Sequence, residues 1–159
     1  MVRRWTAGTV STCCGPEGVK LRELTADDED ALGHLLWEGF GADGFDGFAS
    51  ASAADEEARA TLAGKWGPMI WDASVLALRD DTAVAASVVL KDDAHQLSPL
   101  LAFLVTDPEH RRQGIAESLI LETIRRIEAL QERELHLAVT PENPARALYL
   151  RLGFAEESR

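Results

Sequence analysis

Residues 97–130 combine an apolar run, a short polar turn and a long amphipathic pattern in one continuous stretch. The run from Leu97 to Val105 is almost entirely apolar, which is typical of a buried strand. From Gly114 to Leu130 the apolar residues recur at helical spacing with charged residues between them, which predicts an amphipathic helix. A buried strand that leads directly into such a helix indicates a sheet covered by helices, and therefore an α/β fold.

The other elements follow from shorter patterns, and the expected order along the chain is βααβββαβα. Asp80 and Asp81 separate two β-rich runs and predict a hairpin. Thr25 is expected to cap the first helix and Asn143, followed by Pro144, the last one. The expected strands are 19–24, 74–79, 82–91, 97–105 and 135–139, and the expected helices are 25–36, 53–66, 114–130 and 144–153.

The size of the chain, 159 residues and 17.3 kDa, predicts one domain with a full hydrophobic core. We assign this domain to residues 19–159 and treat residues 1–18 as an N-terminal tail or an extra strand. No apolar run is long enough for a membrane span or a signal peptide. The two cysteines, Cys13 and Cys14, are adjacent and provide no disulfide framework. A cytoplasmic protein without membrane attachment or a metal site is therefore expected.

The net charge of −11 argues against a nucleic-acid partner, because phosphates are bound by clustered Lys and Arg. The acidic residues are concentrated in the first half of the chain. Residues 22–72 contain twelve acidic and three basic residues, a balance of −9, whereas residues 73–159 have a balance of −4. An acidic surface around a binding site favours a cationic ligand.

The turn before the helix at 114–130 has the features of a phosphate site. Backbone N–H groups at a helix start lack intrahelical partners and, with the helix dipole, attract phosphate. Gly114 and Ala116 keep side chains out of the ligand's way, while Arg111 and Arg112 add positive charge. The sequence therefore predicts a diphosphate site here; a tight connection without a ligand is the alternative.

Two motifs resemble those of the GCN5-related N-acetyltransferase (GNAT) superfamily. Arg111-x-x-Gly114-x-Ala116, preceded by Asp107-Pro108-Glu109-His110, resembles the turn that binds the pyrophosphate of acetyl-CoA. The segment from Asn143 to Phe154 resembles the second signature, in which Asn opens a helix and Tyr149 precedes the closing Gly153-Phe154. Both motifs occur in the family's order, and the resemblance extends from Val19 to Phe154.

The resemblance implies a mixed, largely antiparallel central sheet flanked by helices, with splayed fourth and fifth strands and a shortened C-terminal end. It implies acetyl-CoA as the cofactor, with the pantetheine arm between those two strands and the thioester carbonyl polarised by a backbone N–H, for which we choose Leu104. The expected cofactor-binding residues are Phe103, Leu104, Val105, Arg111, Arg112, Gln113, Gly114, Ile115, Ala116, Asn143 and Ala147.

Tyr149 and Asn143 are the expected catalytic residues. A phenol with a pKa of about 10 can protonate the thiolate that leaves when an amine attacks a thioester. Tyr149 is the only tyrosine in the chain. A buried amphipathic residue is the alternative for Tyr149, and a simple helix cap is the alternative for Asn143.

The sequence departs from the family pattern in two places. Residues 100–104 contain no carboxylate to serve as a base. Deprotonation through water to Asp92, Asp93 or His95, or to Asp43 or Asp46 of the loop, is one alternative, and an acceptor amine that is already partly neutral and needs no strong base is the other. Few residues follow Phe154, which would leave the fifth strand as an uncovered edge. We expect either the segment from Met1 to Cys14 or a second subunit, in a homodimer, to cover it.

The loop from Gly39 to Phe48 and the acidic segment around it are expected to border the acceptor site. Phe40, Asp43, Phe45 and Asp46 are the candidate substrate-binding residues, and they suit a polyamine, an aminoglycoside or a lysine side chain. Phenylalanines that only anchor the core are the alternative.

The predicted function is acetyl transfer from acetyl-CoA to a primary amine of a small molecule or protein, by direct attack in a ternary complex. A CoA-binding regulatory or assembly protein with little or no catalysis is the main alternative, and a structural domain without a CoA site is another.

Overall fold

The computed structural model describes residues 2–6, 16–41, 47–92 and 97–157; Cys13 and Cys14 lie outside these ranges. Seven strands form one sheet in the order β2-β3-β4-β5-β6-β1-β7, and all neighbours are antiparallel except the parallel pair β5 and β6. The strands are β1 (Val2–Thr6), β2 (Val19–Glu23), β3 (Val75–Arg79), β4 (Thr82–Asp92), β5 (Ser98–Thr106), β6 (Glu134–Ala138) and β7 (Ala155–Glu157).

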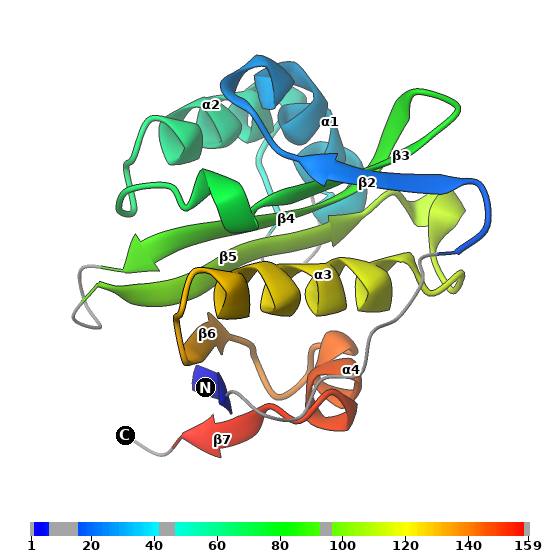
Figure 1. The fold of residues 1–159 in the computed structure, drawn as a ribbon. Coiled ribbons are helices and arrows are strands. Elements are labelled where there is room, and N and C mark those ends of the chain that lie inside the picture. The colour runs from blue at the N-terminus through cyan, green and yellow to red at the C-terminus, as the bar shows by residue number, and fades with distance from the viewer. Residues whose placement is uncertain (1, 7–15, 42–46, 93–96, 158–159) are drawn as a thin grey trace.

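Helices cover both faces of this sheet (Figure 1). The helices α1 (Glu29–Phe40) and α2 (Ala51–Leu62) lie on one face, and α3 (Ile115–Ala129) lies on the other, with α4 (Ala145–Arg151) beyond β6. The described ranges also contain the short 3₁₀ turns η1 (Ala26–Asp28), η2 (Trp71–Ala73) and η4 (Pro108–His110). The α/β class and the largely antiparallel sheet predicted from the sequence are confirmed, and the predicted order of elements is present from β2 to α4, with β1 before it and β7 after it.

The hairpin predicted at Asp80 and Asp81 is present, because both residues adopt left-handed backbone conformations with φ of 50° and 64°. Such a two-residue turn matches the twist of the flanking strands. Apolar side chains then form the core on each side of β4. Leu35, Leu36 and Ala58 pack against Val88 on the α1–α2 face, while residues of α3 pack against the other face.

The bounds of the first two helices differ from the prediction. Thr25 precedes the 3₁₀ turn η1, and α1 begins at Glu29 because the Asp28 carboxylate accepts the Thr25 N–H at 2.8 Å. The helix α2 begins at Ala51 rather than Ala53, since the Ser50 hydroxyl accepts the Ala53 N–H. It ends at Leu62 rather than Trp66, which leaves Trp66 in the loop after the helix.

The outer edge of β6 is covered by the N-terminal segment, one of the two covers expected from the sequence. β1 pairs antiparallel with β6 from Val2 opposite Ala138 to Thr6 opposite Glu134. The three residues of β7 pair with β1 in turn, so the segment after Phe154 contributes a strand that the sequence did not predict. This pairing satisfies the backbone groups that an open edge would expose; the homodimer and the division at residue 18 stay predictions.

Candidate active site

The strands β5 and β6 diverge at the centre of the molecule. Their parallel ladder joins Leu100 to His136, and both strands continue beyond this pair without further pairing to each other in the described residues. On its other edge β5 pairs with β4, where the register shifts between Val88 and Val89 and leaves Ala102 opposite no residue. A bulge bends its strand and frees backbone groups. The predicted splay is confirmed, and it opens toward the C-terminal ends of both strands.

The predicted phosphate turn lies where β5 leads into α3. Arg112 has φ of 63° and Gly114 has φ of 78°, so the chain turns sharply before the helix. Gly114 is the N-cap of α3 and supplies no side chain to cap the helix. The Ser118 N–H donates to the Gly114 carbonyl at 3.1 Å. The residues between Gly114 and Ser118 form the first turn of α3, and backbone N–H groups in a first turn have no acceptor within the helix.

A cavity of about 240 Å³ lies over this helix start. Its lining combines backbone of the turn with side chains from α3 and α4: Thr106, His110, Arg111, Arg112, Gly114, Ile115, Ala116, Glu117, Leu148 and Arg151. A Cβ placed on Gly114 would meet no atom within 4 Å, so the space above the N-terminus is open to a ligand. The His110 Nδ1 atom is buried without a hydrogen-bond partner among the described residues, and it lies 3.8 Å from Asp107 Oδ1. These groups fit a diphosphate.

The structure gives the three polar residues of the turn different roles. Arg111 donates to the Gly39 carbonyl at 2.6 Å and so ties the turn to the end of α1. Gln113 accepts from Arg79 at 2.6 Å, and Arg112 is exposed beside the cavity. The Ile115 side chain is buried in the core below α3, which leaves its backbone N–H as its means of contacting a ligand.

Arg151 is a cavity residue that the sequence reasoning missed. It comes from the last turn of α4 and pairs with Glu117 of α3 at 3.1 Å. The two partners are 34 residues apart, so no local pattern connects Arg151 with the phosphate turn. Its guanidinium is the third arginine of the cavity lining, after Arg111 and Arg112.

Tyr149 and Leu104 contribute to the same hydrophobic cluster on the α3 side of the sheet. Tyr149 is 7% exposed and belongs to a core cluster against which Leu104 packs. Its ring contacts Phe154 edge to face, with 5.7 Å between the ring centres. The packing expected of a core residue is therefore present, and the position of Tyr149 beside the thioester stays a prediction.

Asn143 caps the start of α4, since its Oδ1 atom accepts the Ala145 N–H at 2.9 Å. This is the simpler of the two roles expected for it. Ala147 is exposed on α4, and Val105 is buried on β5. Contact of these residues with a cofactor stays a prediction.

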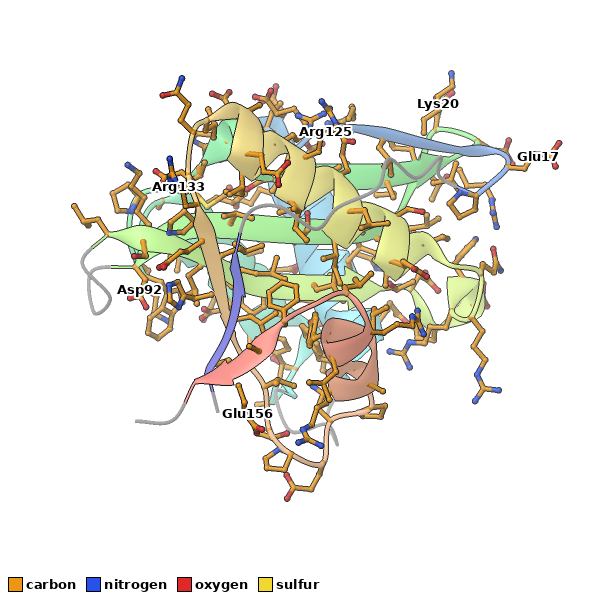
Figure 2. The ribbon with its side chains drawn as sticks, turned by 60° about the horizontal axis from the view of Figure 1, so that its bottom comes forward. Glu17, Lys20, Asp92, Arg125, Arg133 and Glu156 are labelled. Carbon is orange, nitrogen blue, oxygen red and sulfur yellow. The ribbon has the colours of Figure 1, made fainter. Side chains whose placement is uncertain are left out.

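A second cavity, of about 410 Å³, lies on the opposite face of β5, toward α2. It is lined by Gly47, Phe48, Glu57, Trp66, Asp92, Leu100, Ala102 and Phe103. Figure 2 shows Asp92 at the end of the sheet opposite Glu17 and Lys20. Phe103 lines this cavity and is also a predicted pantetheine residue, so the cavity adjoins the expected thioester position.

Of the four predicted substrate-binding residues, Phe40 packs against Phe48 and Phe103 with ring centres 6.5 and 6.2 Å away. Phe40 thus packs against the core cluster between the sheet and the first two helices. This agrees with the alternative role, in which the phenylalanines anchor the core. Asp43, Phe45 and Asp46 lie outside the described residues, as do Asp93 and His95.

Glu57 and Trp66 are the cavity residues that the sequence reasoning did not select. The Glu57 carboxylate accepts from Trp66 Nε1 at 2.6 Å and from Lys65 Nζ at 2.9 Å. Partial burial alone would raise the pKa of Glu57, but the hydrogen bonds from Trp66 and Lys65 outweigh burial and lower it. Glu57 is therefore held as a carboxylate.

The described residues contain no cluster of His, Cys, Asp and Glu that could hold a metal ion. No helix among them has both the length and the apolar character needed to cross a bilayer.

A family model described as an acetyltransferase (GNAT) domain matches residues 71–156. No curated protein sequence matches the chain. Among solved structures, a GCN5-related N-acetyltransferase from Sphaerobacter thermophilus aligns with a TM-score of 0.71 and 20% identity, over 97% of this chain and 47% of that protein. The chain thus spans about half the length of that relative.

Two further structures share the fold over most of both chains. The ribosomal-protein-S18-alanine N-acetyltransferase from Escherichia coli aligns with a TM-score of 0.67 and 21% identity, over 88% of this chain and 79% of that one. The PaiA N-acetyltransferase from Thermoplasma acidophilum, solved with coenzyme A, aligns with a TM-score of 0.66 and 18% identity, over 87% and 91%. At these identities the likeness describes the fold.

Proposed function

This chain belongs to the acetyltransferase (GNAT) domain family, and on that premise we propose that it transfers the acetyl group of acetyl-CoA to a primary amine. The observation that carries the proposal is the uncapped start of α3, which opens onto a cavity lined by Arg111, Arg112 and Arg151. This cavity suits the diphosphate of CoA, and Thr106 at the end of β5 is part of its lining.

The two cavities lie on different sides of β5, and this arrangement supports direct attack in a ternary complex. Acetyl-CoA, when bound, supplies the acetyl group as an activated thioester. The backbone of Phe103 to Val105 positions that thioester, and the Leu104 N–H polarises its carbonyl. The amine in the second cavity then attacks the carbonyl carbon, so that a C–N bond forms and the C–S bond breaks.

Proton transfers at the two ends of the reaction need an acid and a base. Tyr149 donates its phenolic proton to the departing sulfur. Asp92, which lines the acceptor cavity, takes the ammonium proton through water. Several residues were predicted from the sequence as possible bases. Asp92 is assigned this role because it is the one of them that lines this cavity among the described residues.

Thiol release from acetyl-CoA in the presence of a panel of primary amines tests the proposal. Tyr149→Phe keeps the ring that packs on Phe154 and removes only the hydroxyl. We expect kcat to fall by about 10²- to 10⁴-fold, while the rise in melting temperature caused by CoA stays the same.

Equal rates for wild type and Tyr149→Phe would remove the acid role of Tyr149. A clear thermal shift with CoA and no thiol release with any amine would favour the binding protein without catalysis. If CoA causes no shift at all, the cofactor assignment itself is wrong.

A further inference from the structure

The cavity over the start of α3 contains a carboxylate of the chain itself. Glu117 lies in the first turn of α3 and lines this cavity together with Arg111, Arg112 and Arg151. A helix N-terminus attracts any anion, because its free N–H groups and the helix dipole act on a carboxylate as they act on a phosphate. The Glu117 carboxylate therefore competes with a diphosphate for this site and also repels it.

Arg151 binds this carboxylate. An acidic residue at the third position of a helix, as Glu117 is in α3, can reach back to the N–H of the N-cap residue. Here the Arg151 Nη2 atom donates to Glu117 Oε2 at 3.1 Å. Since Arg151 is the last residue of α4, the charge of Glu117 is neutralised by a residue from the other helix that lines the cavity.

The arginines of the lining differ in what they bind within the chain. Arg111 donates to the Gly39 carbonyl and Arg151 to the Glu117 carboxylate, whereas Arg112 is exposed beside the cavity. A guanidinium paired with a carboxylate adds no net positive charge to a site. The contribution of Arg151 to diphosphate binding is then the neutralisation of a negative charge.

The ion pair is too exposed to have a large part in holding α4. The side chains of Arg151 and Glu117 are 64% and 38% exposed, and exposed pairs add little to stability because water screens the charges and two long side chains lose freedom. α4 is held by Tyr149 and Leu148, which pack in the core cluster on the α3 side of the sheet. Loss of the pair should therefore affect the ligand more than the fold.

We infer that Arg151 is a positioning residue of the cofactor site and acts on the diphosphate through Glu117. The ion pair keeps the Glu117 carboxylate from occupying the start of α3 and from repelling the ligand. This inference rests on the proposed binding of acetyl-CoA. It predicts that the effect of Arg151 depends on Glu117, whereas an arginine that contacts the diphosphate directly would act whether or not Glu117 is charged.

Isothermal titration with CoA tests this dependence in the wild type, Arg151→Met, Glu117→Gln and the double variant. Arg151→Met removes the charge and keeps an unbranched side chain. Its Kd should rise about tenfold, because an unpaired like charge then faces the ligand. Glu117→Gln should bind CoA as tightly as the wild type or more tightly. In the double variant Kd should return to within about threefold of the wild-type value, since the two effects are coupled.

Arg59→Met is the matched control. Arg59 and Glu29 form a pair of nearly the same exposure, 65% and 36%, and neither residue lines the cavity, so Kd should not change. Arg151→Lys keeps the positive charge and should bind CoA nearly as the wild type does. In the thiol-release assay Arg151→Met should raise KM for acetyl-CoA and leave kcat unchanged, whereas a displacement of α4 that moved Tyr149 would lower kcat.

Dephospho-CoA locates the effect on the ligand, because it keeps the diphosphate and lacks the 3′-phosphate. Arg151→Met should raise Kd for both ligands by the same factor.

Three results would overturn the inference and leave the cofactor assignment standing. They are an unchanged Kd in Arg151→Met, a double variant that binds CoA as weakly as Arg151→Met, and a rise in Kd that is absent with dephospho-CoA. The second would mean that Arg151 contacts the ligand directly, and the third that it serves the 3′-phosphate. Failure of the wild-type protein to bind either ligand would refute the cofactor site and the inference together.

Discussion

The close approach of α1 to β5 at Gly39 joins the fold to the phosphate turn and can be tested by adding one methyl group. A Cβ at Gly39 would lie 2.2 Å from Val105 Cγ2 and 3.3 Å from the Thr106 carbonyl oxygen. Val105 is 2% exposed, so its side chain has little room to move away. Gly39→Ala must therefore push the end of α1 away from β5.

Two opposing effects set the magnitude. Replacing glycine by alanine within a helix stabilises it by about 0.5–1 kcal/mol, and by less here because Gly39 lies in the last turn of α1. Overpacking a buried contact costs about 1–3 kcal/mol. Overpacking dominates, and we expect Gly39→Ala to lower the free energy of unfolding by about 1–2 kcal/mol.

Removing the obstructing side chain should reverse part of this loss. Val105→Ala alone deletes two buried methyl groups and should cost about 2 kcal/mol, from about 0.8 kcal/mol per group and a term for the cavity. In the double variant the new methyl at Gly39 occupies the vacated space. The combined loss should be smaller than the sum of the two single losses by about 1–2 kcal/mol.

Urea denaturation of the four proteins measures these differences from the linear dependence on denaturant. Val75→Ala is the matched control, because Val75 is fully buried in a different cluster, beside α3. Its effect should add to that of Gly39→Ala. If the effects of Gly39→Ala and Val105→Ala also add within about 0.5 kcal/mol, the packing argument is refuted. Since the Gly39 carbonyl accepts from Arg111, Gly39→Ala should also weaken the thermal shift with CoA.

Two other predictions concern the turn before α3 and the start of α1. Gly114→Ala and Gly18→Ala should each lower the free energy of unfolding by about 1–2 kcal/mol, because both glycines have φ near 80° and no atom within 4 Å of an added Cβ. Only Gly114→Ala should weaken CoA binding in a titration. If both variants bind CoA with the same affinity, Gly114 is not part of the cofactor site. The hydrogen bond from Arg22 lowers the pKa of the Asp28 carboxyl in the folded protein, so its stabilising contribution is present above the unfolded pKa of about 4 and is lost as the pH falls through the lower folded pKa. Asp28→Asn should therefore destabilise the protein more at pH 7 than at pH 3 in urea denaturation, and a difference from wild type that does not change with pH would contradict this account.

The local signals in the sequence were sufficient for most of the helices and strands and for the turn before α3, whose binding of diphosphate stays a prediction. Asp80 and Asp81 predicted a hairpin because a two-residue turn depends on its own backbone conformation. The helix after Gly114 was predictable because amphipathic spacing is read within one segment. The same applies to the phosphate turn, whose free N–H groups arise wherever a helix starts without a side-chain cap.

Only the tertiary structure decided which side chains those elements bring together. Arg111 bonds to Gly39, 72 residues away, and Glu57 with Trp66 forms a cavity wall although neither belongs to a motif. β1 joins the sheet between β6 and β7, a choice between alternatives that the N-terminal sequence left open. Such contacts depend on how distant segments of the chain pack against each other. The local conformational preferences of each segment therefore do not determine which distant residues it will contact.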